Sequence, residues 1–429
     1  MGMKKKLIHR DIRDKVWKWK EDREVIFILG ARRVGKTTLL GMLYDDVKGQ
    51  KIYIDLEYTD ILGVLNRGID SFLNYLRLQG IDLNKRSYVF IDEVQYLNNP
   101  ANLLKLLYDH HPNIKIIASG SSSIHIKQKF TDSLAGRKIV FDLSSFNMNE
   151  FLRAKDEELY NLKKKWSNFQ NVIASKEINP EISAFTNRFL PLIEEYIIWG
   201  GYPQVVLNSK VEKKEGILKD IYQSYISKDV RDIGRIGNIT GYNNLVVMLA
   251  SSIGQLVNKE NISRNIRLNV KTIDDYMLLL EHTYIIKRIS PFYRNKRTEI
   301  VKQKKVYFRD TGIRNMAIES FQPFNIRPDK GYLTENFVFN QLLNYFSSDN
   351  TSFWRTKNKA EVDFIIANGE NNIPVEVKSR EMKKPEYTRS FLGYIEKYKS
   401  ELGIVININF ARVERVKNTK ILFVPIFAL

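Results

Sequence analysis

Five short runs of β-branched and aromatic residues dominate the first third of the chain, and stretches long enough for helices separate them. The runs are almost continuously apolar, which is typical of strands buried on both faces of a parallel sheet. They cover residues 25–30, 51–57, 87–94, 114–121 and 138–145. The pattern predicts an α/β domain over residues 1–150, with helices on both faces of a parallel sheet.

A glycine-containing loop joins the first of these runs to a helical stretch. Gly30 is followed by four residues and then by Gly35, Lys36 and Thr37, which is the spacing of a phosphate-binding loop. Glycines let backbone N–H groups approach phosphates at a helix N-terminus. We expect ATP to bind here, with Lys36 on its β- and γ-phosphates. The expected binding residues are Gly30, Ala31, Arg32, Arg33, Val34, Gly35, Lys36, Thr37 and Thr38.

Acidic and hydroxyl residues end the third and fourth runs. Asp92 and the Thr37 hydroxyl are the expected ligands of Mg²⁺, and Glu93 is expected to orient and polarise the attacking water. Ser119 and Ser121 close the fourth run, which lies beside the third in this type of sheet, where a hydroxyl can sense the γ-phosphate. Together these residues predict Mg²⁺-dependent hydrolysis of ATP.

Arg137 stands immediately before the fifth run, at the junction with the preceding helical stretch. The order of motifs up to this point resembles AAA-type ATPases, in which an arginine at this junction reaches the γ-phosphate bound by the neighbouring subunit. The resemblance implies a homo-oligomer with ATP at the subunit interfaces. A solvated arginine at a helix end is the alternative.

The middle of the chain divides into two further segments. Residues 151–240 are helical patterns interrupted at "INPEI" and "WGGYPQVVL", and we expect them to form the helical lid that follows an AAA core. Residues 241–325 carry three helical patterns and then two strand-like runs, the order of a winged helix. Asn269 is expected to cap the third of these helices.

The net charge of +19 is concentrated in the predicted winged helix. Between residues 287 and 309, nine basic residues stand against one acid, Glu299. Such a cluster favours DNA phosphates as partners, and Lys271 is placed to reach a groove or backbone. We expect contact directed by backbone or DNA structure, with a protein-docking module as the alternative. The nine are Lys287, Arg288, Arg294, Lys296, Arg297, Lys302, Lys304, Lys305 and Arg309.

Residues 326–429 contain a second candidate site. Helical spacing puts Glu335 on the same face as Phe339 and Leu342, so its carboxylate points inward and needs a partner there. The strand period of two puts Glu376 and Lys378 on one face, and Asp363 lies in the preceding strand. Glu335, Asp363 and Glu376 supply oxygen ligands suited to Mg²⁺, while Lys378 can position or deprotonate a water.

The second site resembles the restriction-endonuclease-like, or PD-(D/E)XK, superfamily. Asp363, then Glu376 thirteen positions later, then Lys378 match its D…ExK signature, within a predicted helix–strand–strand–strand–helix–strand (αβββαβ) order. The resemblance implies a Mg²⁺-dependent nuclease domain. A nuclease-like scaffold with an inactive site is the alternative.

Taken over nearly its full length, the chain resembles a prokaryotic, especially archaeal, family of AAA-like P-loop ATPases with a winged helix and a C-terminal nuclease-like domain of uncharacterised function. The resemblance implies an ATPase that acts on or near DNA, in repair, recombination or defence. A regulatory NTPase switch, whose last domain only docks DNA or protein, is the alternative. The matching motifs are "GARRVGKT", "VFIDEVQYL", "ASGSSS", "SLAGR", "GGYPQVV", "TENFVFNQLL", "EVDFII" and "PVEVKS".

Composition narrows the remaining possibilities. The sequence has no cysteine, which excludes disulfides and thiolate zinc sites. It has no apolar run near the ~18 residues that a membrane span needs. Its basic start lacks the apolar segment of a signal peptide. We therefore expect a cytoplasmic protein without membrane contact.

Overall fold

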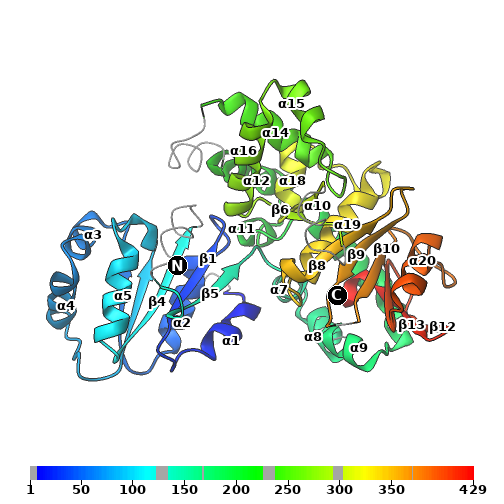
Figure 1. Ribbon diagram of the computed structural model, residues 1–429. Helices are drawn as coiled ribbons and strands as arrows, with labels where there is room; N and C mark the ends of the chain where they lie inside the picture. The colour runs from blue at the N-terminus through cyan, green and yellow to red at the C-terminus, as the bar shows by residue number, and fades with distance from the viewer. Residues whose placement is uncertain (1–6, 122–133, 167–168, 226–236, 293–302, 370) are drawn as a thin grey trace. The chain divides into compact units, whose positions relative to one another are not determined.

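The computed structural model describes residues 7–121, 134–166, 169–225, 237–292, 303–369 and 371–429. The chain divides into two compact units, which are described separately (Figure 1). The first contains Met1–Phe146, Gln223–Gly237 and Leu278–Tyr284. The second contains Asn147–Tyr222, Asn238–Met277 and Ile285–Leu429.

A five-stranded, fully parallel sheet organises the first unit, in the order β2-β3-β4-β1-β5. The predicted strands are confirmed, since each coincides with an apolar run of the sequence to within a few residues. The strands are β1 Val25–Gly30, β2 Gln50–Asp55, β3 Ser87–Asp92, β4 Ile114–Ser121 and β5 Lys138–Leu143.

Helices cover both faces of this sheet, as the continuous apolar strands predict. Val89 and Ile91 of β3 share a buried cluster with Phe72 and Leu104. Phe90, which points to the other face, meets the ring of Tyr44 edge-on at 5.5 Å. Within residues 7–121, the helices are α1 Asp11–Trp17, α2 Lys36–Asp46, α3 Thr59–Asn66, α4 Ile69–Leu78, the 3₁₀ turn η1 Val94–Tyr96 and α5 Pro100–His110.

The segment expected to form a helical lid is indeed helical. Asn147 starts its first helix with a capping box, because its side chain accepts the Glu150 amide and the Glu150 carboxylate accepts the Asn147 amide. The helices are α7 Met148–Lys155, α8 Glu157–Trp166, α9 Phe169–Ser175, η2 Pro180–Phe185, α10 Thr186–Trp199, α11 Pro203–Val206 and α12 Val211–Ser224.

Three helices and a two-stranded antiparallel ribbon follow, in the predicted order. The predicted cap is confirmed, since Asn269 Oδ1 accepts the amide of Thr272 at 2.7 Å. The elements are α14 Ile239–Ser251, α15 Lys259–Ile266, α16 Val270–His282, β6 Ile286–Ile289 and β7 Lys305–Phe308, followed by α18 Thr311–Ala317 and η4 Phe324–Ile326.

A mixed six-stranded sheet, in the order β12-β13-β11-β10-β9-β8, closes the second unit. β8, β9 and β10 are antiparallel neighbours, whereas β10, β11 and β13 run parallel. Among these strands β12 was not predicted, because its charged residues hide the apolar alternation of a strand that is only partly buried at the edge of the sheet. The elements are α19 Lys330–Leu342, η5 Ser348–Asn350, β8 Thr351–Arg355, β9 Glu361–Ile366, β10 Ile373–Val377, α20 Arg389–Tyr398, β11 Leu402–Asn407, β12 Arg412–Val416, β13 Thr419–Pro425 and η6 Ile426–Ala428.

Within the described ranges, every helix is too short or too polar to cross a lipid bilayer.

The "GGYPQVV" motif makes a tight junction inside the second unit. Gly200 ends α10 with φ 75°, and a Cβ placed on it would lie 2.0 Å from Oδ1 of Asp310. That same oxygen caps α18 by accepting the amide of Gly312 at 2.9 Å, while Oδ2 accepts the amide of Gly201 at 2.9 Å. One carboxylate therefore joins the end of α10 to the start of α18, and only glycine leaves it room.

We predict that Gly200→Ala lowers the free energy of unfolding by about 3 kcal/mol, because it adds a clash to a backbone conformation that only glycine adopts readily. Urea unfolding of the purified chain measures the change. Gly216→Ala is the matched control. Gly216 lies within α12 with open space around its Cα, so alanine there is expected to stabilise the helix by about 0.5–1 kcal/mol. Equal stabilities of the two variants would refute the packing argument.

Candidate functional site

The loop between β1 and α2 has the geometry of a phosphate cradle. Gly35 adopts φ 98° at the start of α2, and the first amides of a helix have no acceptor within the helix. The Lys36 ammonium, only 5% exposed, donates to the carbonyls of Gly30 at 3.2 Å and Ala31 at 2.9 Å. Thr37 and Thr38 are exposed on the first turn. A phosphate oxygen can take the place of the carbonyls around Lys36.

A buried arginine supports this loop from outside the motif. Arg10, 4% exposed, donates to the carbonyl of Val34 at 2.7 Å and to the carbonyl of Ser144 at 2.7 Å. Its guanidinium also lies 4.9 Å from the ring centre of Phe146. Of the remaining loop residues, Arg32 is partly buried and Arg33 is exposed. The sequence contains no local signal for Arg10, because its partners lie far along the chain.

Asp92 lies at the end of β3 and is 1% exposed. Its Oδ1 accepts hydrogen bonds from the hydroxyl of Ser119 and from the Glu93 amide at 3.1 Å, and its Oδ2 accepts the hydroxyl of Tyr53 at 2.9 Å. The structure thus brings Ser119 to Asp92, as the strand order predicts. Tyr53, on the neighbouring β2, was missed. Burial, reinforced by the charge of Asp92, raises its pKa, so the phenol remains a donor.

Glu93 and Ser121 complete the same edge of the sheet. Glu93 adopts the left-handed backbone conformation, with φ 54°. This conformation is rare for residues other than glycine, and where it occurs it is found preferentially at functional sites. Gln95 donates to its carboxylate. Ser121 lies in register with Gly30, directly beside the phosphate loop. The carboxyl ends of β1, β3 and β4 therefore present the groups predicted for ATP hydrolysis, except Arg137, at one edge of the sheet.

Arg137 lies at the opposite end of the strands, where β1 and β5 begin. The next residue, Lys138, is in register with Val25, five positions before Gly30, so the arginine starts about 16 Å from the phosphate loop of its own chain. Its Nε donates to Asp109 at 2.8 Å, which lowers the pKa of that carboxyl, and its side chain is 33% exposed. Action on the nucleotide of its own chain is therefore not supported by this position.

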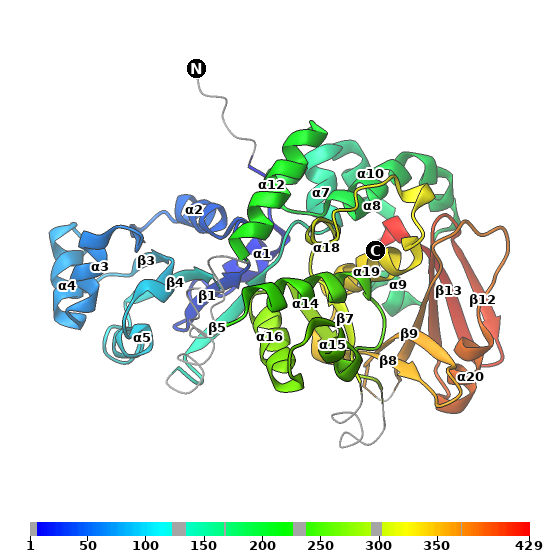
Figure 2. The same cartoon turned by 90° about the horizontal axis from the view of Figure 1, so that it is seen from above.

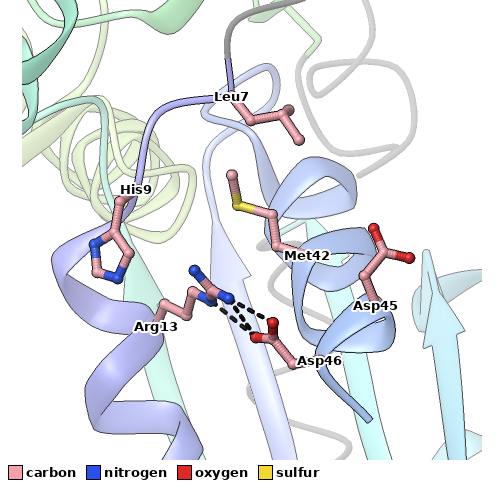
Figure 3. A pocket seen from close by; sticks show the side chains of 6 residues that line it. All are labelled: Leu7, His9, Arg13, Met42, Asp45 and Asp46. Atoms are coloured by element: carbon pink, nitrogen blue, oxygen red, sulfur yellow. Dashed lines mark hydrogen bonds and ion pairs between the residues drawn. The ribbon is translucent and has the colours of Figure 1, made fainter. Parts of the chain in front are cut away.

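A shallow hollow opens between the N-terminal segment and the last turns of α2 (Figure 3). The Arg13 side chain extends across the hollow, and one of its terminal nitrogens donates hydrogen bonds to both carboxylate oxygens of Asp46, at 2.6 Å and 2.5 Å. The carboxylate is thereby paired within the chain, and the hollow holds a structural ion pair that ties α1 to α2. Its walls are formed by Leu7, His9, Arg13, Met42, Asp45 and Asp46.

The second candidate site centres on a buried ion pair. Glu335 of α19 is 8% exposed, and its Oε1 accepts hydrogen bonds from the Lys305 ammonium at 3.0 Å and from the Tyr307 hydroxyl at 2.5 Å. Both donors belong to β7, which lies beside α19 (Figure 2). The predicted inward direction of Glu335 is confirmed, and its partner is Lys305, a member of the basic cluster that was expected to contact DNA phosphates.

The same lysine reaches a second carboxylate. Lys305 Nζ lies 2.7 Å from Oε1 of Glu361 at the start of β9, and its side chain is 1% exposed. Burial alone would lower the pKa of this ammonium, but the surrounding carboxylates, led by Glu335, outweigh burial and raise it. Lys305 is therefore charged and is not available to DNA phosphates, which corrects the expectation from the basic cluster.

Asp363 lies next to this ion pair, on β9. Pairing of β9 with β10 ends at Phe364 and Val375, and the Asp363 carboxylate accepts the Val377 amide at 2.7 Å. Burial and the negative charge of Glu335 raise its pKa to about 8, although Lys305 opposes the shift.

Lys378 directly follows β10, and its side chain lies on the same side as that of Glu376, as the strand period predicts. The Lys378 ammonium donates to Glu376 Oε1 at 2.7 Å, and the other oxygen accepts the Thr388 amide at 3.0 Å. Glu376 is 5% exposed, so this pair is largely withdrawn from solvent.

The three carboxylates do not form the expected metal site in this arrangement. Among the residues that the structure describes, no three His, Cys, Asp or Glu side chains are grouped so that they could hold a metal ion. Glu335 faces Lys305 and Tyr307, and Asp363 and Glu376 each accept a backbone amide. The chain's own donors thus bind one oxygen of Glu335, one of Asp363 and both of Glu376, the carboxylates that Mg²⁺ was expected to bind.

The rest of the basic cluster is only partly described. Lys287, Lys304 and Arg309 are partly buried, and Arg288 lies 4.0 Å from Asp274. Lys271 is exposed near the start of α16. The remaining members, together with the acid between them, lie outside the described residues: Arg294, Lys296, Arg297, Glu299 and Lys302.

A family match covers the segment that carries the first site. Residues 22–152 match a family model described as "AAA domain". This match supports a P-loop ATPase fold for that segment. Beyond this AAA domain, residues 190–323 and 330–428 match two models described as "Domain of unknown function", DUF8612 and DUF4143.

Relatives of similar length occur in archaea and bacteria. An uncharacterized protein of Methanocaldococcus jannaschii is 27% identical over 90% of this chain and 82% of its own length. One from Haemophilus influenzae is 24% identical over 87% of each chain. Among solved structures, the Walker-type ATPase PABY2304 of Pyrococcus abyssi is 16% identical over 73% of this chain and 97% of its own, with a TM-score of 0.46.

Proposed function

We propose that this protein is an ATP-hydrolysing, DNA-binding protein whose AAA domain cleaves the β–γ phosphate bond of ATP. The observation that carries the proposal is the junction of Asp92, Ser119 and Glu93 at the edge where the phosphate loop lies. Lys36 binds the phosphates, and the strained Glu93 orients water for attack. Ser119 and Tyr53 each donate a hydrogen bond to the Asp92 carboxylate, and these two bonds fix the orientation of the carboxylate group.

The residues around the loop fit a magnesium ion of the nucleotide. The exposed Thr37 hydroxyl and the buried Asp92 carboxylate would hold it, directly or through water. When bound, Mg²⁺ neutralises charge that develops on the phosphate oxygens. Tyr53 is a neutral donor beside Asp92, and it leaves the negative charge of the carboxylate in place for the ion.

DNA is the proposed partner of the segment from α14 to β7. Three helices followed by a ribbon support a winged helix, and the basic residues between 287 and 309 support phosphate contact. Lys271 is exposed near the start of α16, where a winged helix presents its recognition helix. Because Lys305 is buried, we assign the phosphate contacts to the other members of the cluster.

We predict that Lys36→Ala weakens ATP binding by roughly 10–100-fold, because it removes a charged hydrogen-bond donor. Glu93→Gln is expected to leave binding intact and to lower turnover by about 100-fold or more, because it removes the group that polarises water. Fluorescent-nucleotide titration and phosphate release, each with and without DNA, measure the two effects. Unchanged turnover in Glu93→Gln would remove Glu93 from the mechanism, and turnover indifferent to DNA would favour a regulatory NTPase switch.

Arg137 is the proposed trans-acting group of a homo-oligomer, since it lies remote from the loop of its own chain. We predict that Arg137→Ala and Lys36→Ala are each inactive alone, and that an equal mixture regains about one quarter of wild-type turnover through interfaces with one intact site and one intact arginine. Steady-state ATP turnover after subunit exchange measures this. Arg23→Ala is the control, because Arg23 is also a surface arginine near Tyr108. A fully active Arg137→Ala chain would identify the arginine as structural.

Nuclease activity is a second candidate function. It is favoured by the direct pairing of Glu376 with Lys378 beside Asp363, on adjacent strands. Cleavage with Mg²⁺ requires the carboxylates to exchange their present partners for the ion. The alternative is a domain that docks DNA or protein and does not cut.

We predict that, if the chain cuts DNA, Asp363→Ala abolishes divalent-dependent cleavage while ATP turnover and DNA binding survive, because the AAA domain and the basic segment lie elsewhere in the chain. Lys378→Ala is expected to slow cleavage without abolishing it. Asp349→Ala, an exposed acid of the same unit, is the control. The assay uses linear, circular and branched DNA with Mg²⁺ or Mn²⁺, with and without ATP. If wild-type protein binds these substrates and cuts none of them, the docking alternative holds.

A further inference from the structure

Four carboxylates converge around the first strands of the C-terminal sheet, and three cations of the same chain lie among them. The carboxylates are Glu335, Glu361, Asp363 and Glu376. Lys305 pairs with the first two, Arg355 lies 2.8 Å from Glu361, and Lys378 lies 2.7 Å from Glu376. Such a cluster attracts a divalent cation unless its charge is already compensated.

Lys305 differs from the other two cations in its burial and its origin. Its side chain is 1% exposed, against 32% for Arg355 and 18% for Lys378. It also comes from β7, outside the sheet that carries three of the carboxylates. The aromatic ring of Phe353 lies 5.4 Å from its ammonium, and the Tyr307 hydroxyl, two residues along β7, binds the same oxygen of Glu335. The strand β7 therefore inserts one positive charge and one neutral donor into the cluster.

We infer that Lys305 is the resident cation of this acid cluster: it holds Glu335, Glu361 and Asp363 in an arrangement that cannot bind a divalent ion, and its removal would let the three carboxylates close around one. The ammonium bridges two carboxylates from different elements, α19 and β9, which is the structural task of a metal ion in a carboxylate site. A divalent ion would have to displace it, and an expelled ammonium would remain buried without a partner, which is strongly unfavourable. The lysine thus excludes the ion by occupying its ligands.

The inference concerns the same site as the second candidate function and rests on that function only for its biological meaning. If the domain is a nuclease, Lys305 holds it inactive until β7 is displaced. If the domain does not cut, Lys305 explains how the acid cluster remains folded without metal. The ion pairs themselves are independent of either outcome.

Manganese binding by the full-length, nucleotide-free chain tests the inference. Wild-type protein is expected to show no Mn²⁺ binding that depends on Glu335, whereas Lys305→Met is expected to gain one ion per chain, with at least tenfold tighter binding than wild type. Electron paramagnetic resonance of free Mn²⁺ measures the stoichiometry. Adding Glu335→Gln to Lys305→Met should remove the gain. Lys304→Met is the matched control, because it deletes the same charge one position away without opening the cluster.

Two results would overturn the inference. One is a wild-type chain that already binds an ion removed by Glu335→Gln, and the other is a folded Lys305→Met chain that gains none. If Lys305→Met is unstable, Mn²⁺ should raise its thermal midpoint and leave that of Lys304→Met unchanged, and the absence of such a rise counts equally against the inference. Wild-type chains that never cut DNA would refute the nuclease alone, because none of these measurements uses cleavage.

Discussion

Burying a charge without a partner is strongly unfavourable, and this constraint shapes both candidate sites. In the AAA domain the Lys36 ammonium is held by loop carbonyls, and Asp92 accepts hydrogen bonds on both of its oxygens. Lys115, under the opposite edge of the same sheet, donates to the carbonyls of Trp19, Asp22 and Glu24, although burial lowers its pKa to about 8. In the C-terminal sheet the same requirement is met by Lys305. The two lysines differ in their partners. The carbonyls that bind Lys36 can be replaced by a phosphate of the substrate, whereas Lys305 is paired with buried carboxylates of the chain itself.

The AAA domain could be predicted almost completely from the sequence, because its signals are local. Continuous apolar runs predict parallel strands, and parallel strands bring their carboxyl ends to one edge. The strands that end in Asp92 and Ser119 were expected side by side, and in the structure the two side chains hydrogen-bond there. What escaped prediction came from distant parts of the chain. Arg10 supports Val34 from 24 positions upstream, and Tyr53 reaches Asp92 from a different strand. The residues next to Arg10 and Tyr53 in the sequence form no motif that indicates a role at the ATP site.

At the C-terminal acid site, the directions of the side chains could be predicted from the sequence but their partners could not. The direction of each side chain followed from helix and strand periodicity, and Glu335 and Glu376 point as expected. Their partners did not follow, because a periodic pattern specifies which face a residue occupies and not what covers that face. Lys305 stands among eight other basic residues in the sequence and looks like a surface cation. Only its packing against α19 distinguishes it, and that packing depends on elements about 30 residues apart.

The ion pair between Lys305 of β7 and Glu335 of α19 also limits how such a protein can evolve. Asn336 of α19 accepts the amide of Phe308 at 2.8 Å and donates to its carbonyl at 2.7 Å, so the helix completes the backbone hydrogen bonding of β7 as well as neutralising Lys305. A recombination breakpoint between β7 and α19 would separate a buried lysine from its glutamate and leave both halves with an uncompensated charge. The ribbon and the C-terminal sheet are therefore expected to be inherited as one block, and the natural place for domain exchange lies upstream of β6.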